Sequence, residues 1–173
     1  MQYRVLFVCT ANICRSPTAE LLSRYRYGED RVLVRSAGFL MEGESSPSLL
    51  IDALAEHGID GSHHRSHKVD VASLNAADLV LTMEGDHVQR ATLLHREAFP
   101  KIMPLTEAAA VIREHGPMVP ADLVAAVNRE RDPGSYLSTT WDVDDPYKRK
   151  LKDYRRAVVE ISGLVDDVVG RLA

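Results

Sequence analysis

Cysteine is scarce in this sequence, with two in 173 residues. Two thiols cannot build the disulfide framework of a small secreted domain, so we expect a reducing, cytoplasmic location. Long apolar runs are missing too, and none is long enough to cross a bilayer. The first residues lead directly into a strand-like segment, with no signal or transit pattern. These absences argue against a secreted scaffold and against a membrane protein.

Positive charge is also not in excess. Lysine and arginine number 21 against 25 aspartates and glutamates, which gives a formal net charge of -4. General nucleic-acid binding usually needs a basic face, so we predict no nucleic-acid partner. The hydrophobic content of 45% and the charged content of 27% are typical of a globular chain. The length suits one domain with its own core.

Apolar runs alternate with helical patterns along the chain. Strands are predicted at residues 5–8, 32–34, 78–82 and 101–103, and helices at 17–27, 46–58, 86–96, 108–115, 120–130 and 151–168. We place Ser16 as the N-cap of the first helix and Gly28 as its stop. The alternation predicts an α/β fold with a parallel sheet and helices on both faces, a three-layer sandwich.

The most informative segment is Cys9-Thr10-Ala11-Asn12-Ile13-Cys14-Arg15-Ser16, which joins the first strand to the first helix. Backbone N–H groups of such a loop, together with a helix N-terminus, form an anion-binding nest. Arg15 adds a planar fork that can hold two oxygens of one anion. The same positive field favours the thiolate of Cys9 as a nucleophile. Asn12 and Ser16 can fix the loop or donate to the sulfur.

Cys9 alone has a simpler interpretation, as a buried thiol at the end of a strand. The arginine, the strand and the helix start all stand at the right spacing, which makes the nucleophile the better interpretation. Ligands of parallel sheets bind beyond the carboxyl ends of the strands, where Cys9 lies. We therefore take residues 9–16 as an oxyanion-binding loop around a sulfur nucleophile.

Residues 9–17 resemble the signature of the low-molecular-weight protein tyrosine phosphatases, which often reads Cys-x-x-Asn-Ile-Cys-Arg-Ser-Pro. Ser36-Ala37-Gly38 and Met83-Glu84 resemble further landmarks of that family. The resemblance implies a central sheet of four parallel strands, a phosphocysteine intermediate, and no cofactor. It also implies that Thr10, Ala11, Asn12, Ile13, Cys14 and Ser16 bind the substrate's phosphate.

Departure of a phenolate from phosphorus needs a proton donor, because the pKa of tyrosine lies near 10. The sequence Asp144-Asp145-Pro146-Tyr147 resembles the family's Asp-Pro-Tyr segment, whose aspartate is the general acid. The resemblance assigns that role to Asp145 and places Tyr147 beside the mouth of the pocket. Asp142 and Asp144 remain competitors for the acid.

Lys148-Arg149, which follows Tyr147, resembles the bacterial branch of the family. Some members of that branch act beside tyrosine kinases of polysaccharide export. The resemblance implies a phosphotyrosine protein as substrate, with a bacterial tyrosine kinase as one candidate partner. Compared with the smallest members, the segment around 106–141 is long; we interpret it as an insertion with its own short helix, inside a single domain spanning residues 1–173.

Two other functions stay open at this point. Arsenate reduction with an external small thiol is the alternative, because no third cysteine is present to relay a disulfide. A phosphotyrosine-binding module without turnover is the other. Cys14 is either a packing residue or a thiol that traps oxidised Cys9 as a disulfide.

Histidines gather between residues 57 and 67. No cysteine or suitably spaced carboxylate completes a zinc ligand set there, so we predict no metal site. His64 resembles a family histidine that supports the phosphate loop through the asparagine.

Overall fold

Four parallel strands form the single sheet of the computed structural model, which describes residues 2–172. The strand order is β2-β1-β3-β4, with β1 at Tyr3–Cys9, β2 at Val32–Gly38, β3 at Leu79–Thr82 and β4 at Ile102–Pro104. β1 pairs with β2 along its whole length, so that Cys9 lies opposite Gly38. The predicted four-stranded parallel sheet is confirmed.

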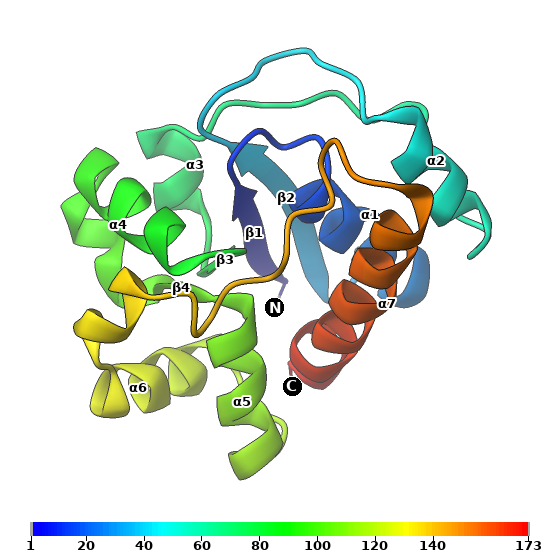
Figure 1. Ribbon diagram of the computed structural model, residues 1–173. Coiled ribbons are helices and arrows are strands. Elements are labelled where there is room, and N and C mark those ends of the chain that lie inside the picture. Colours follow the sequence, from blue (N-terminus) through cyan, green and yellow to red (C-terminus); the bar gives the residue numbers. More distant parts are fainter. Residues whose placement is uncertain (1, 173) are drawn as a thin grey trace.

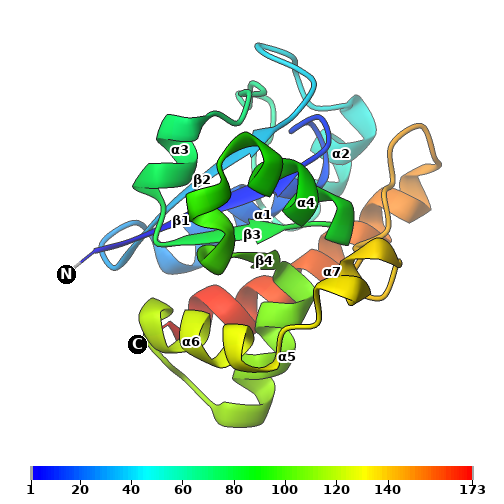
Figure 2. The ribbon, with the colours of Figure 1, turned by 90° about the vertical axis from the view of Figure 1, so that its left-hand side faces the viewer.

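Side chains of β1 alternate between two separate apolar clusters. Val5 and Phe7 point into the larger cluster, whereas Leu6 and Val8 point into the smaller one. The larger cluster is covered by α1 (Arg15–Tyr27), α2 (Ser48–Ala55), α5 (Leu105–His115) and α7 (Leu151–Val168), and the smaller by α3 (Val71–Ala76) and α4 (Gly85–Leu94). Figures 1 and 2 show α3 and α4 on the side of the sheet opposite to α5 and α7. This is the predicted three-layer sandwich.

Helix α1 begins earlier than predicted. It starts at Arg15, and Cys14 occupies the N-cap position without a side-chain hydrogen bond. The prediction of Ser16 as N-cap is therefore wrong, because the hydroxyl of Ser16 is turned toward Cys9 and the end of β2. Gly28 ends the helix as predicted, with φ of 64°. The left-handed region suits glycine because other residues meet a steric penalty there.

The short helix α3 was not predicted. It has six residues, which is too few for a periodic apolar pattern to stand out. Its local signal is a capping box, in which the carboxylate of Asp70 accepts from the backbone N–H of Ser73 at 2.7 Å.

The segment 106–141 contains most of α5, then α6 (Pro120–Glu130) and a 3₁₀ helix, η2 (Pro133–Leu137). Both predicted helices are present, and α6 has the predicted bounds. Leu105 and Ile112 of α5 and Leu123 of α6 lie in the larger core cluster. The segment therefore packs against the same core as the rest of the chain. Its origin as an insertion stays a prediction.

The last helix, α7, presents an apolar stripe to the core. Tyr154, Val158, Ile161, Val165 and Val168 are all buried, as the periodicity predicted. The remaining 3₁₀ helices are η1 (Arg96–Lys101) and η3 (Val169–Arg171). Among residues 2–172, no helix has both the length and the apolar character needed to cross a membrane.

Candidate active site

The loop from Cys9 to Arg15 lies at the carboxyl end of β1 and leads into α1 (Figure 1). Cys9 is 3% exposed, and its Sγ lies 3.3 Å from the backbone N–H of Asn12, which donates to it. The hydroxyl of Ser16 lies 3.0 Å from the same sulfur. Asn12 has φ of 54°, which turns the chain back around the sulfur. Hydrogen-bond donors at a sulfur stabilise its anionic form, as the predicted nucleophile requires.

Asn12 holds the loop in this shape through its own hydrogen bonds. Its Nδ2 donates to the hydroxyls of Ser16 at 2.9 Å and Ser36 at 2.8 Å. Its Oδ1 accepts from the backbone N–H of His67 at 2.8 Å. Nε2 of His64 donates to the carbonyl of Asn12 at 2.7 Å, so the predicted support from His64 is confirmed as a contact. A fully buried amide with every group bonded makes a rigid loop.

Gly38, at the end of β2, lets the loop approach the sheet closely. A Cβ at this position would lie 2.6 Å from the backbone N of Asn12 and 2.8 Å from the carbonyl carbon of Ala11. Both neighbours are backbone atoms, so any larger residue would displace the loop.

Arg15 is buried, with 2% of its side chain exposed, and several protein groups hold its guanidinium. Nη2 donates to Oδ2 of Asp145 at 3.0 Å, and Nη1 donates to the carbonyl of Val143 at 2.9 Å. Nη1 also forms an ion pair with Oε1 of Glu84. Burial opposes the charge, but Asp145, Cys9 and Glu84 outweigh it and raise the pKa of Arg15. The guanidinium is thus a fixed positive charge beside Cys9.

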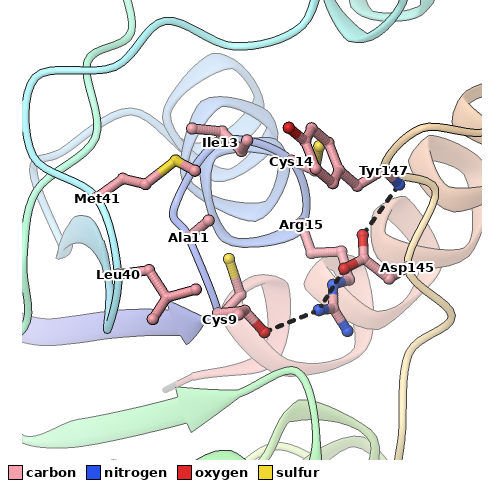
Figure 3. A pocket seen from close by; sticks show the side chains of 10 residues that line it. Cys9, Ala11, Ile13, Cys14, Arg15, Leu40, Met41, Asp145 and Tyr147 are labelled. Atoms are coloured by element: carbon pink, nitrogen blue, oxygen red, sulfur yellow. Dashed lines mark hydrogen bonds and ion pairs between the residues drawn. The ribbon is translucent and has the colours of Figure 1, made fainter.

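A cavity of about 110 Å³ opens above Cys9. In Figure 3, Leu40 and Met41 lie on one side of the sulfur, and Asp145 and Tyr147 lie on the other. The cavity is lined by Cys9, Thr10, Ala11, Ile13, Cys14, Arg15, Leu40, Met41, Asp145 and Tyr147.

Two of the predicted substrate-binding residues, Asn12 and Ser16, do not line the cavity. Their side chains are fully buried behind the loop. They support the loop, and the backbone N–H of Asn12 faces the sulfur.

Three aspartates competed for the role of acid, and their positions differ. Asp145 lines the cavity, and its Oδ1 accepts from the backbone N–H of Tyr147 at 3.1 Å. Asp142 caps α4 by accepting from the backbone N–H of Gly85 at 2.9 Å. Asp144 instead pairs with arginines of the loop and of α7, at 2.7 and 3.1 Å. Only Asp145 faces the cavity and Arg15.

Cys14 also lines the cavity, but its chemistry differs from that of Cys9. Burial, the Asp145 carboxylate and Cys9 raise the pKa of Cys14 to about 12. Its thiol is therefore protonated at neutral pH, and attack on an oxidised Cys9 would first require its deprotonation. The disulfide between Cys9 and Cys14 stays a hypothesis.

Sequence reasoning missed the contacts of Glu84 and Val143 with Arg15. Glu84 follows β3, which neighbours β1, so its place at the carboxyl edge of the sheet was a usable signal. Val143 contributes a backbone carbonyl, for which a sequence carries no signal.

The sequence model of the family described as low molecular weight phosphotyrosine protein phosphatase matches residues 4–120. The chain belongs to this family. Members of the family are hydrolases that act on phosphoric monoesters, and a thiol-centred site of the kind around Cys9 fits that chemistry. A phosphatase family does not favour the arsenate reductase alternative.

Several relatives align with nearly the whole length of this phosphatase. A probable low molecular weight protein-tyrosine-phosphatase, EpsP of Ralstonia solanacearum, is 27% identical over 168 residues, which are 97% of this chain and 94% of EpsP. The structure of the arginine phosphatase YwlE from Geobacillus stearothermophilus is 29% identical with a TM-score of 0.77, covering 98% of this chain and 92% of its own. The structure of a low molecular weight protein tyrosine phosphatase from T. tengcongensis is 31% identical with a TM-score of 0.75. The match covers 99% of this chain and 100% of that chain.

Proposed function

We propose that this phosphatase hydrolyses phosphotyrosine monoesters with Cys9 as nucleophile, Arg15 as oxyanion ligand and Asp145 as general acid and then base. The observation that carries the proposal is the meeting of Asp145 and Arg15 at 3.0 Å on the edge of the cavity over Cys9. These residues come from opposite ends of the chain.

The first step forms a sulfur–phosphorus bond and breaks the phosphorus–oxygen bond to the leaving phenol. Loop N–H groups and Arg15 neutralise the charge on the phosphoryl oxygens. Asp145 transfers its proton to the leaving oxygen, so that tyrosine departs neutral. The bound phosphoryl group takes over the guanidinium donor that Asp145 engages in the free enzyme.

The second step breaks the sulfur–phosphorus bond. The Asp145 carboxylate accepts a proton from water, and the water oxygen attacks phosphorus. Inorganic phosphate leaves and the thiolate of Cys9 is restored. No further reactant is consumed.

The mouth of the cavity supports an aromatic substrate. Leu40 and Tyr147 line it and are 54% and 41% exposed, while Ile13 and Met41 add apolar surface. An aryl ring buries apolar area against such side chains, whereas a guanidinium would lose hydration against them. One structural relative is named an arginine phosphatase, so phosphoarginine belongs in the test.

A phosphotyrosine protein is the proposed substrate, with a bacterial tyrosine kinase as a candidate partner. This finer assignment rests on the resemblance of the segment after Tyr147 to the bacterial branch. The proposed location is the cytoplasm, because a thiolate nucleophile needs a reducing environment to stay active.

The test measures hydrolysis of phosphotyrosine and phosphoarginine peptides by wild type, Cys9→Ser, Asp145→Asn and Asp144→Asn. We expect Cys9→Ser to abolish turnover. Asp145→Asn should lower kcat on phosphotyrosine by roughly 10²–10⁴-fold, the usual contribution of a general acid. Asp144→Asn, the matched control outside the cavity, should stay within a fewfold of wild type. Turnover by Cys9→Ser, or a higher kcat/KM on phosphoarginine, would contradict the proposal.

A further inference from the structure

His87, in the first turn of α4, carries a buried imidazole that packing alone does not explain. The residue is fully buried, and its Nε2 lies 2.9 Å from the hydroxyl of Thr10. Its Nδ1 is buried with no hydrogen-bond partner among the described residues. A buried polar atom without a partner costs free energy, and its presence in a folded site calls for a functional explanation.

Thr10 connects His87 to the reacting groups. It is the residue after Cys9, it lines the cavity, and its Oγ1 lies 3.5 Å from Nη2 of Arg15. The nearest carboxylate oxygen to Nε2 of His87, on Glu84, lies 3.7 Å away, beyond hydrogen-bond distance. Thr10 is therefore the hydrogen-bond partner that fixes the ring.

The proton arrangement follows from the surroundings of the ring. Burial, Arg15 and Arg90 lower the pKa of His87 to about 3, so the ring is neutral at neutral pH. An unpartnered acceptor nitrogen is tolerated better than an unpartnered buried N–H. The proton accordingly sits on Nε2 and is donated to Oγ1 of Thr10. The hydroxyl hydrogen of Thr10 then remains available to an acceptor in the cavity.

We propose that His87 is a positioning residue for phosphoryl transfer, which orients the hydroxyl of Thr10 so that this hydroxyl donates to a phosphoryl oxygen bound above Cys9. The proposal rests on the proposed function. The hydrogen bond from Thr10 to the phosphoryl oxygen strengthens as charge develops on the phosphoryl group. Loss of this bond should therefore lower kcat more than it changes KM. His87 itself does not touch the substrate.

The experiment is a double-mutant cycle on kcat for an aryl phosphate, with His87→Leu, Thr10→Val and the double variant. Each single change should lower kcat by roughly tenfold, the worth of one hydrogen bond to a charged group. The double variant should lose no more than the worse single variant, because both changes remove the same donated hydrogen bond. His87→Gln, which carries a donor near the place of Nε2, should recover part of kcat.

Val88→Ala is the matched control. Val88 is the next residue of α4, is 1% exposed and packs in the smaller core cluster. It should lose stability but keep kcat within about twofold, since it has no polar link to the cavity. If His87→Leu does not fold, Thr10→Val against Thr10→Ser still decides, because only serine keeps the hydroxyl.

Multiplicative effects in the cycle, or wild-type kcat in Thr10→Val, would overturn the role of His87. Failure of the proposed function looks different, because the wild type would then be inactive or Cys9→Ser would keep its activity. An active, Cys9-dependent enzyme that is indifferent to His87 would refute this inference alone.

Discussion

Gly38 allows the oxyanion-binding loop, residues 9–16, to approach the sheet because it has no side chain. We predict that Gly38→Ala lowers kcat/KM on an aryl phosphate more than tenfold, because its Cβ would collide with the backbone of Asn12 and shift donors aimed at Cys9. Steady-state kinetics beside circular dichroism would check this. Gly163→Ala is the control, because a Cβ there meets nothing within 4 Å. Unchanged kinetics in a folded Gly38→Ala variant would mean that the loop tolerates the shift.

His87 should make the fold sensitive to acid. Its pKa is about 3 in the fold, against an ordinary value of 6.5. Between these values the unfolded chain binds a proton that the folded chain does not, so stability falls as pH falls through this window. The slope is up to about 1.4 kcal/mol per pH unit. Urea unfolding of wild type and His87→Gln at several pH values would measure this slope. The same pH dependence of stability in both proteins would refute the role of His87.

At the residue scale, the proposed reacting groups and the loop supports Asn12, Ser16 and His64 could be predicted, whereas the contacts of Glu84 and His87 could not. Cys9, Arg15 and Asp145, the proposed reacting groups, stand in short motifs. Glu84 and His87 make contacts with Arg15 and Thr10 that only the folded chain creates. Ser16 had the right chemistry for an N-cap, but the sulfur of Cys9 and the side chain of Asn12 compete for its hydroxyl.

At the scale of elements, two glycines in or beside helices should respond in opposite ways to alanine. Gly28 ends α1 with φ of 64°, so Gly28→Ala should destabilise the fold by about 1 kcal/mol. Gly163 lies inside α7 with open space around it, so Gly163→Ala should stabilise by about 0.5–1 kcal/mol. Chemical denaturation of both variants would test this pair. If both variants changed the stability in the same direction, local backbone preference would not determine the effect of alanine at these positions.

Element prediction succeeded where the pattern was long or strongly bounded. The periodic stripe of α7, the buried run of β1 and the proline start of α6 all carried local signals. Helix α3 was not predicted because its six residues make less than two turns.

At the scale of the whole molecule, α7 holds together the helical layer over the larger core cluster, because it packs against α1, α2 and α5. Ile161→Ala should cost about 2–5 kcal/mol, a large share of a typical stability of about 5–15 kcal/mol. Val159, in the same helix, is 61% exposed, so Val159→Ala should change stability by about 0.5 kcal/mol or less. Thermal and urea unfolding would compare the two. Similar losses in both would contradict the assigned core face of α7.

Sequence patterns alone could not predict which distant segments of the chain come into contact. The match to the family covers residues 4–120, yet Asp145 lies beyond it and reaches Arg15 across the sheet edge. The resemblance of a short Asp-Pro-Tyr segment suggested this partner. The contact itself comes from the return of the chain between α6 and α7 over the end of β1 (Figure 1).

The way Arg15 is held has a consequence for product release. Glu84, Val143 and Asp145 fix its guanidinium, so the anion site is rigid by virtue of internal contacts. A rigid site loses little conformational entropy on binding, whichever phosphate arrives. Inorganic phosphate, the released product, shares the group that the loop recognises. We therefore expect inorganic phosphate to compete with phosphoester substrates for this site.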